Sequence, residues 1–285
     1  MKKLTMLLLT LTLVFSCIGC GSKEDSANDA ANVEAEAETG AETDAEEDAD
    51  VAEPEAEAAD ETQEEDAAEV EGVMTYDEYV AADLDSEVVV ETYVQAKQSW
   101  WEDKATLYTQ DQDGAYFVYN VACSQEDYDK LTPGTKIKVT GYKSEWSGEV
   151  EIVDGTFEIE DGNYVAEAED VTGLLGSDEL INHQNEFVTF KGMTVEAAGQ
   201  DDDGNDVAFL YNWDGSGQDG DDLYFNVSLD GTTYTFTVES YLCDNTTDVY
   251  SAVKALNIGD KIDMEGFLYW YEGVNPHITS VTAAN

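Results

Sequence analysis

Tryptophan side chains are the residues of this chain best suited to holding a ligand. Trp100, Trp101 and Trp146 lie among acidic and turn-forming residues, and Trp270 is followed by Tyr271. Rings in such polar surroundings are expected to be more exposed than core residues are. Their flat faces, beside carboxylates, suit sugar rings, peptides or nucleobases. These residues predict a ligand-binding surface; the alternative is that some rings only close the end of a domain or seat one domain on another.

An acidic loop is the second candidate site. Positions 201–206 read DDDGND, which places oxygen donors at Asp201, Asp203 and Asn205, the alternating spacing of calcium-binding loops. The loop departs from the EF-hand pattern, because the glycine and the glutamate required at its sixth and twelfth positions are missing. No cofactor is expected apart from Ca²⁺ at this loop, and a flexible polar loop is the alternative.

Catalytic motifs are not recognisable. His183 and His277 have no partner motif and are expected to be structural or surface residues. There is no nucleophile elbow, metalloprotease helix or phosphate loop, and carboxylates are too abundant for one pair to be singled out as glycosidase acids. Cys123 and Cys243 are expected to be buried free thiols, with a disulfide between them as the alternative. We therefore expect a protein that is not an enzyme.

The first residues predict attachment to a membrane. Two lysines precede an apolar run over 4–15, the pattern of a secretory signal that is too short to remain as a spanning helix. The stretch 19–22 (GCGS) resembles the bacterial lipobox, whose cysteine receives a diacylglycerol and becomes the new N-terminus. The resemblance implies a signal peptide over 1–19, lipidation of Cys20 with diacylglycerol and palmitate, and a lipoprotein on the extracellular face of the cell membrane. Cys17 is the alternative frame, and it also stands where the family prefers leucine.

Beyond the lipidated cysteine, residues 20–72 read as a disordered acidic linker. Glu, Asp, Ala, Thr and Ser make up almost all of it, with about twenty acidic residues and no aromatic ring. Such a segment cannot bury enough apolar surface to offset its ordering entropy, and its charges repel one another. We expect an extended tether.

The charge of the chain disfavours nucleic acid as a partner. The formal net charge is −53 at pH 7, and all 12 basic residues are lysines. Such a surface opposes a phosphate backbone. Lys136, Lys138 and Lys143 cluster, but they are expected to be the solvated lysines of an edge strand. The expected partners are an extracellular glycan or protein, and the membrane through the N-terminal lipid.

An internal repeat divides the folded part into two domains. Residues 131–142 (LTPGTKIKVTGY) align without gaps with residues 256–267 (LNIGDKIDMEGF). In both, a glycine ends a helix, an alternating strand follows, and a second glycine marks a bend. A looser match of 87–94 with 186–193 indicates that the second copy carries about 26 additional residues, which we place in the Asp/Gly-rich stretch 199–222.

Each copy predicts three strands, a short helix and two further strands. In the first copy the strands are expected at 88–98, 105–109, 115–121, 136–142 and 149–153, with the helix at 124–131. This is the order of an OB-fold, and the repeated phrase resembles the fourth-strand signature of exported bacterial OB-fold domains. We expect an all-β protein with short helices, in which two tandem OB-like five-stranded Greek-key barrels occupy 73–170 and 171–285. Another pair of small barrels, or one β-sandwich, is the alternative.

OB-folds bind ligands with the loops after strands 1 and 4 and with the sheet face between them. In the first copy these loops carry Trp100, Trp101 and Trp146, which are expected to converge; Trp270 and Tyr271 occupy the matching turn of the second copy. We therefore expect a lipid-anchored extracellular module that binds a carbohydrate or protein ligand without catalysis. The alternative is a calcium-dependent structural or adhesive surface module that uses the acidic loop.

Overall fold

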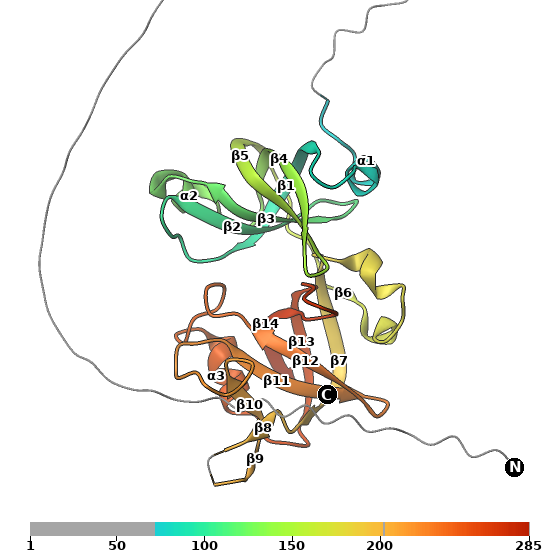
Figure 1. Cartoon of the computed structure of the whole chain (residues 1–285), viewed down its shortest axis with the longest axis vertical. Helices are drawn as coiled ribbons and strands as arrows, with labels where there is room; N and C mark the ends of the chain where they lie inside the picture. The colour runs from blue at the N-terminus through green and yellow to red at the C-terminus, as the bar shows by residue number, and fades with distance from the viewer. Residues whose placement is uncertain (1–71, 202, 285) are drawn as a thin grey trace, which may run out of the picture. The chain divides into compact units, whose positions relative to one another are not determined.

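Two five-stranded β-barrels account for most of the structure, a computed structural model that describes residues 72–201 and 203–284 (Figure 1). All of these residues belong to one compact unit. The expected signal peptide, Cys20 and nearly all of the acidic linker lie outside the described residues. Within the described ranges no helix has the length and apolar character needed to cross a membrane.

The first barrel closes through five strands in the order β1-β2-β3-β5-β4, with β1 paired to β4. Valines at alternate positions of β1, such as Val88 and Val90, point into its core because successive side chains of a strand face opposite ways. Its elements are β1 (Glu87–Lys97), β2 (Lys104–Gln110), β3 (Ala115–Ala122), α2 (Gln125–Lys130), β4 (Thr135–Trp146) and β5 (Glu149–Asn163). The predicted order of strands and helix is confirmed.

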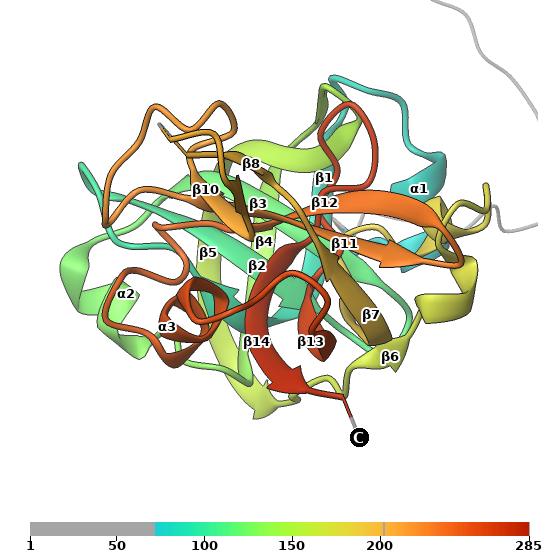
Figure 2. The ribbon, with the colours of Figure 1, turned by 90° about the horizontal axis from the view of Figure 1, so that it is seen from below.

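The second barrel repeats this order. Its strands pair as β11-β12-β14-β13-β7, and an additional pairing of β11 with β7 closes the ring. Its elements are β7 (Phe187–Glu196), β11 (Leu223–Leu229), β12 (Thr232–Val238), α3 (Asp248–Lys254), β13 (Lys261–Phe267) and β14 (His277–Ala283). Figure 2 looks along the direction that joins the two barrels, so that they are superposed. The prediction of an all-β protein with two OB-like barrels is confirmed.

Short elements extend and join the barrels. The additional residues of the second copy lie between β7 and β11, where they form the β8–β9 hairpin and then β10, which adds to β11. The segment between the barrels contains β6, which pairs with β7, and two 3-10 helices. The bounds are β6 (Glu169–Asp170), η1 (Thr172–Leu174), η2 (Leu180–His183), β8 (Gly199–Gln200), β9 (Asp206–Val207) and β10 (Phe209–Tyr211).

The lysines of β4 differ from the prediction. Because the barrel is closed, β4 pairs on both sides and is not an edge strand. Lys143 is buried, and its Nζ donates hydrogen bonds at 2.8–3.0 Å to carbonyls at the end of α1 (Tyr76–Ala81), a helix that the sequence analysis did not predict. A cation at a helix C-terminus satisfies carbonyls that lack helical partners. Lys136 forms ion pairs with Glu91 and Glu160.

Cys123 and Cys243 are free and buried, as predicted. Each follows the third strand of its barrel, β3 or β12, and precedes the helix. Burial raises the pKa of each thiol to about 11, so both are protonated at neutral pH. These residues are small core side chains rather than reactive nucleophiles.

Candidate functional site: a cavity between the two barrels

The outer face of the first barrel packs against the second barrel. Tyr108 of β2 and Phe117 of β3 lie opposite each other and point away from their own core. They pack against Phe267 and Tyr269 of the second barrel, with 4.6 Å between the ring centroids of Tyr108 and Phe267. Part of the sheet face that OB-folds use for ligands is therefore covered by the other barrel.

His277 is a buried member of this contact. Its Nδ1 lies 2.6 Å from the phenolic oxygen of Tyr108, and its ring stacks on Tyr269 with 4.2 Å between centroids. Burial lowers the pKa of His277 to about 3, so the imidazole is neutral and its Nδ1 can accept a hydrogen bond from the phenol O–H. His277 is structural, as expected, but it has a specific partner from the other barrel.

Glu149 provides a second buried polar contact across the two barrels. Its Oε2 accepts hydrogen bonds from the backbone N–H of Trp270 at 2.9 Å and from Nε2 of Gln184 at 3.3 Å. Its Oε1 and the neighbouring Oδ1 of Asn185 are buried and have no partner within hydrogen-bonding geometry among the described residues. Burial raises the pKa of Glu149 to about 8, which favours the protonated acid in this contact.

Beside this contact region, a cavity of about 1060 Å³ opens between the barrels. It is lined by nine aromatic residues, namely Trp101, Phe117, Tyr119, Trp146, Trp213, Tyr224, Tyr241, Tyr269 and Tyr271. Four carboxylate residues line it as well, Glu151, Asp222, Glu239 and Glu272, together with Lys104 and the neutral His277. Its volume is at or above the upper end of the range typical of small-molecule sites, about 300–1,000 Å³.

Three predicted ligand-binding residues line this cavity. Trp101 comes from the loop after β1, Trp146 from the end of β4, and Tyr271 from the loop after β13. Trp101 and Trp146 are 68% and 54% exposed, which is unusual for indoles. The rings of Trp146 and Tyr271 lie 5.0 Å apart between centroids. The matching loops of the two copies therefore meet at one site.

Trp100 and Trp270 do not line the cavity, which corrects the expected convergence of Trp100 with its neighbours. Trp100 is half-buried, and its Nε1 donates a hydrogen bond at 2.9 Å to the carbonyl of Cys123 in its own barrel. Trp270 packs against the second core and over Gly148. A Cβ at position 148 would lie 2.9 Å from the Trp270 ring, and the backbone there has φ of +96°, so both space and conformation require glycine. Trp270 therefore contacts the other barrel, whereas Trp100 is held within its own.

Several lining residues were missed by the sequence analysis. Trp213 and Asp222 come from the additional residues before β11, Tyr224 from β11, and Glu239 and Tyr241 from the segment after β12. These positions lie outside the two loops that OB-folds ordinarily use. The available signal was Trp213, a 76% exposed indole in an otherwise Asp/Gly-rich stretch.

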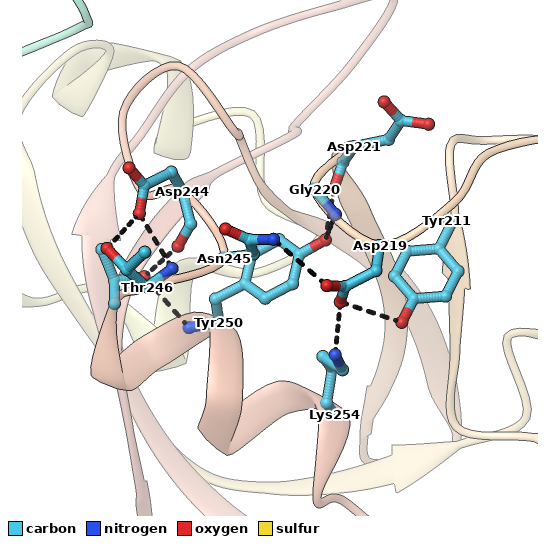
Figure 3. A network of polar contacts seen from close by, with 10 residues as sticks. Tyr211, Asp219, Gly220, Asp221, Asp244, Asn245, Thr246, Tyr250 and Lys254 are labelled. Atoms are coloured by element: carbon cyan, nitrogen blue, oxygen red, sulfur yellow. Dashed lines mark hydrogen bonds and ion pairs between the residues drawn. The ribbon is translucent and has the colours of Figure 1, made fainter.

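A polar network holds the end of this stretch against α3 (Figure 3). Asp219 forms an ion pair with Lys254 and accepts a hydrogen bond at 3.1 Å from Nδ2 of Asn245. The buried hydroxyl of Tyr250 accepts from the N–H of Gly220 at 2.8 Å and donates to the carbonyl of Asp221 at 2.7 Å. These bonds fix the chain immediately before the cavity residue Asp222.

The predicted calcium loop is the turn between β8 and β9. Asp201 accepts hydrogen bonds from the backbone N–H groups of Asp203 and Asn205 at 3.0 and 2.8 Å, and from the Asn205 side chain. These bonds, chiefly those from Asn205, lower the pKa of Asp201. The carboxylate thus closes its own turn, as Asp does in polar loops. Calcium binding here stays a prediction.

Closely grouped metal-ligand atoms occur elsewhere in the described part of the chain. Donor atoms of Glu169, His183 and Glu186 lie within 4.8 Å of one another. His183 Nδ1 is 2.8 Å from Glu186 Oε2 and 3.8 Å from Glu169 Oε2. His183 therefore has acidic partners that its sequence context did not reveal, and its hydrogen bond with Glu186 accounts for the grouping.

Two cavity carboxylates occupy different environments. Glu239 accepts hydrogen bonds from the N–H groups of Tyr241 and Leu242, at 3.2 and 2.8 Å. Burial, with a smaller contribution from Asp222, raises the pKa of Glu239 to about 7. Burial also raises the pKa of Glu151, whose carboxylate makes no hydrogen bond or ion pair with any other described residue.

Comparisons with known proteins leave the function open. No family model and no curated protein sequence matches this chain. Similar solved structures include a murine DNA-binding protein bound to double-stranded DNA (13% identity, TM-score 0.33, 69% of this chain and 96% of that chain). The p204 HINb domain is 12% identical, with a TM-score of 0.32 over 71% of this chain and 99% of that one. The Ifi202 HINa domain in complex with a 20-base-pair duplex is 11% identical, with a TM-score of 0.31 over 70% of this chain and all of that one. These values carry no argument about the ligand of this chain.

Proposed function

We propose that this chain is a non-catalytic carbohydrate-binding module whose ligand occupies the cavity between the barrels. The observation that carries the proposal is the convergence of Trp101, Trp146 and Trp213 on one cavity despite their large exposure. Leaving indoles in water is unfavourable, whereas their flat apolar faces can stack on sugar rings. The neighbouring carboxylates can accept hydrogen bonds from sugar hydroxyl groups.

Electrostatics supports a glycan over a nucleic acid. Glu151, Asp222, Glu239 and Glu272 line the cavity with only Lys104 as a counter-charge. Phosphate groups would be repelled from such a surface, while neutral sugar hydroxyls would not. The DNA seen with similar structures belongs to those proteins.

Removal of one cavity indole should abolish most of the binding. We expect Trp146→Ala in the full chain to weaken binding to a glycan panel by about tenfold, because a sugar ring loses its stacking partner; for nucleobases such a loss costs about 1–3 kcal/mol. Trp146→Phe should retain most of the affinity, since a flat ring remains. The measurement is binding to a glycan array, followed by calorimetry on the polymers that bind.

The panel also contains a DNA duplex and unmodified protein baits. Glycan binding that is unchanged in Trp146→Ala would contradict the proposed site. Binding to DNA or to a protein bait, with no glycan binding, would contradict the proposed ligand. Equal melting temperatures of the two variants and the unmodified chain would show that the loss of binding is not a loss of folding.

We further propose that the module is presented on the extracellular face of a membrane through a lipid on Cys20. The GCGS stretch at 19–22 supports this location. We expect the unmodified chain to incorporate an alkyne-tagged palmitate and to sediment with membranes, and Cys20→Ala to do neither. Labelling that persists in Cys20→Ala but disappears in Cys17→Ala would assign the lipid to the alternative cysteine.

A further inference from the structure

Glu151 is a buried carboxylate that faces the cavity without a protein partner. Along β5 the side chains of Val150 and Ile152 pack in or against the first core. Successive side chains of a strand face opposite ways, so Glu149 and Glu151 point out of that barrel toward the second one. Glu151 lines the cavity and is only 7% exposed. Among the described residues, no side chain or N–H donates to its carboxylate.

The side chain of Glu151 is largely buried, but its carboxylate meets the open cavity. A carboxylate in such a position is stabilised when a cation or several hydrogen-bond donors accompany it. Glu149, two residues away, has the Trp270 N–H and the Gln184 amide as donors. Glu151 has no equivalent donor from the described part of the protein, so its carboxylate is free to accept a hydrogen bond from a ligand in the cavity.

The charges around Glu151 indicate the sign of that partner. Asp222, Glu239 and Glu272 line the same cavity, and Lys104 is its only lysine, while the lining His277 is neutral. The ammonium of Lys104 forms no ion pair with any of these carboxylates in the described part of the chain. The cavity therefore favours a positively charged ligand group and opposes a negatively charged one.

The aromatic lining suits the same kind of group. Phe117 of the lining lies on β3 opposite Glu151 of β5, and Tyr119 stacks on Phe117 with 6.3 Å between centroids. Aromatic faces attract ammonium groups within about 6 Å of the ring centre. A carboxylate framed by such faces is a suitable site for an amine that is partly removed from water.

We propose that the ligand is an amino glycan, with one protonated sugar amine placed against Glu151. This inference rests on the proposed function and adds the charge of the ligand to it. The rings of Trp101 and Trp146 stack on sugar faces, and Glu151 accepts a charge-assisted hydrogen bond from the amine. A glycan whose amines are all acetylated has the same rings but cannot supply that charge.

The test compares two probes that differ only at the amine. Glucosamine hexamer and N-acetylglucosamine hexamer are titrated against the full chain by calorimetry in one near-neutral buffer, because acidification protonates the amines but also favours the neutral form of cavity carboxylates whose pKa is raised by burial. We expect the glucosamine hexamer to bind about tenfold tighter or more, in keeping with a charge-assisted bond. In Glu151→Gln, this preference should disappear, while Glu265→Gln, an exposed carboxylate of β13 that does not line the cavity, should retain it.

The outcomes separate this inference from the proposed function. Equal affinity for the two hexamers, or a preference that survives in Glu151→Gln, would overturn the amine inference while leaving glycan binding intact. Tighter binding to neutral glycans of the panel than to the glucosamine hexamer would also overturn the amine inference and leave glycan binding intact. Binding of a lysine-rich peptide in place of every glycan would overturn both, as would the absence of any glycan binding.

Discussion

The folded chain is expected to lose stability as the pH rises from 4.5 to about 8, through Glu149. The pKa of Glu149 is raised from 4.5 to about 8 by burial between the barrels. In this range the unfolded chain has already released the proton that the folded chain still holds, so deprotonation favours unfolding. The contribution is fully present below pH 4.5 and is lost above the folded pKa.

The expected size of this effect is large. One pKa unit corresponds to about 1.4 kcal/mol, so the Glu149 shift corresponds to at most about 5 kcal/mol of unfolding free energy. Such a change is a substantial fraction of the stability of an ordinary domain, about 5–15 kcal/mol. Few single carboxylates on a protein surface have an effect of this order.

Glu149→Gln tests this expectation directly. The amide stays neutral at every pH and can donate a hydrogen bond where the ionised acid cannot. We expect the variant to unfold at a higher urea concentration than the unmodified chain above pH 8, and the difference to shrink toward pH 4.5. Glu265→Gln serves as the matched control, because Glu265 is an exposed carboxylate. Parallel stability curves for Glu149→Gln and the unmodified chain would disprove the role of Glu149.

Acidification is expected to destabilise the same region through His277. Its pKa is lowered by burial from 6.5 to about 3, so the folded chain holds the imidazole neutral over a range in which the unfolded chain becomes protonated. Stability from this group is therefore fully present above pH 6.5 and is lost progressively as the pH falls toward 3. The upper limit, by the same conversion, is again about 5 kcal/mol.

His277→Gln should remove this acid-sensitive part. At neutral pH the variant should be less stable by about 1–3 kcal/mol, because the phenol of Tyr108 loses its buried partner. Toward pH 3 the gap should close or reverse, since glutamine cannot gain a charge. Urea titrations at several pH values measure this; a gap that stays constant between pH 6.5 and 3 would show that His277 does not titrate on unfolding.

These two groups place opposite pH limits on the contact between the barrels. The folded contact is favoured when His277 is neutral and when Glu149 is protonated. Because the proposed ligand cavity borders the same contact, its geometry depends on both residues. Loss of binding at either pH extreme is therefore expected to coincide with loosening of the barrels.

Much of the fold was predictable because it depends on local patterns. Alternating apolar residues specify strands, as in β1, and a serine before an acidic turn specifies the start of α2. The repeated phrase at 131–142 and 256–267 then identified two copies of one strand order. The helix α1 was missed although Thr75 and Glu78 form a capping box at its start, because it has only six residues; its C-terminal end is held by Lys143 from a distant strand.

The site depended on contacts that no local pattern encodes. Trp101 and Trp146 could be recognised as exposed rings from their polar neighbours, and so could Tyr271. Trp100 has similar neighbours, yet its indole turns inward to the carbonyl of Cys123. Trp213 and Tyr241 join the cavity only because the second barrel brings an inserted stretch and a loop beside the first barrel.

By itself, the sequence determined two OB-like barrels and the aromatic loops at their ends, because strand period, turn chemistry and repetition act over a few residues. Only the tertiary structure decided that the two copies pack face to face, with Tyr108 and Glu149 buried and Glu151 left facing a cavity. These three residues lie on the same outward face of the first barrel and differ only in what covers them. The residues that cover Glu149 and Tyr108 lie between 35 and 169 positions away in the sequence, so their effect appears only once the chain has folded.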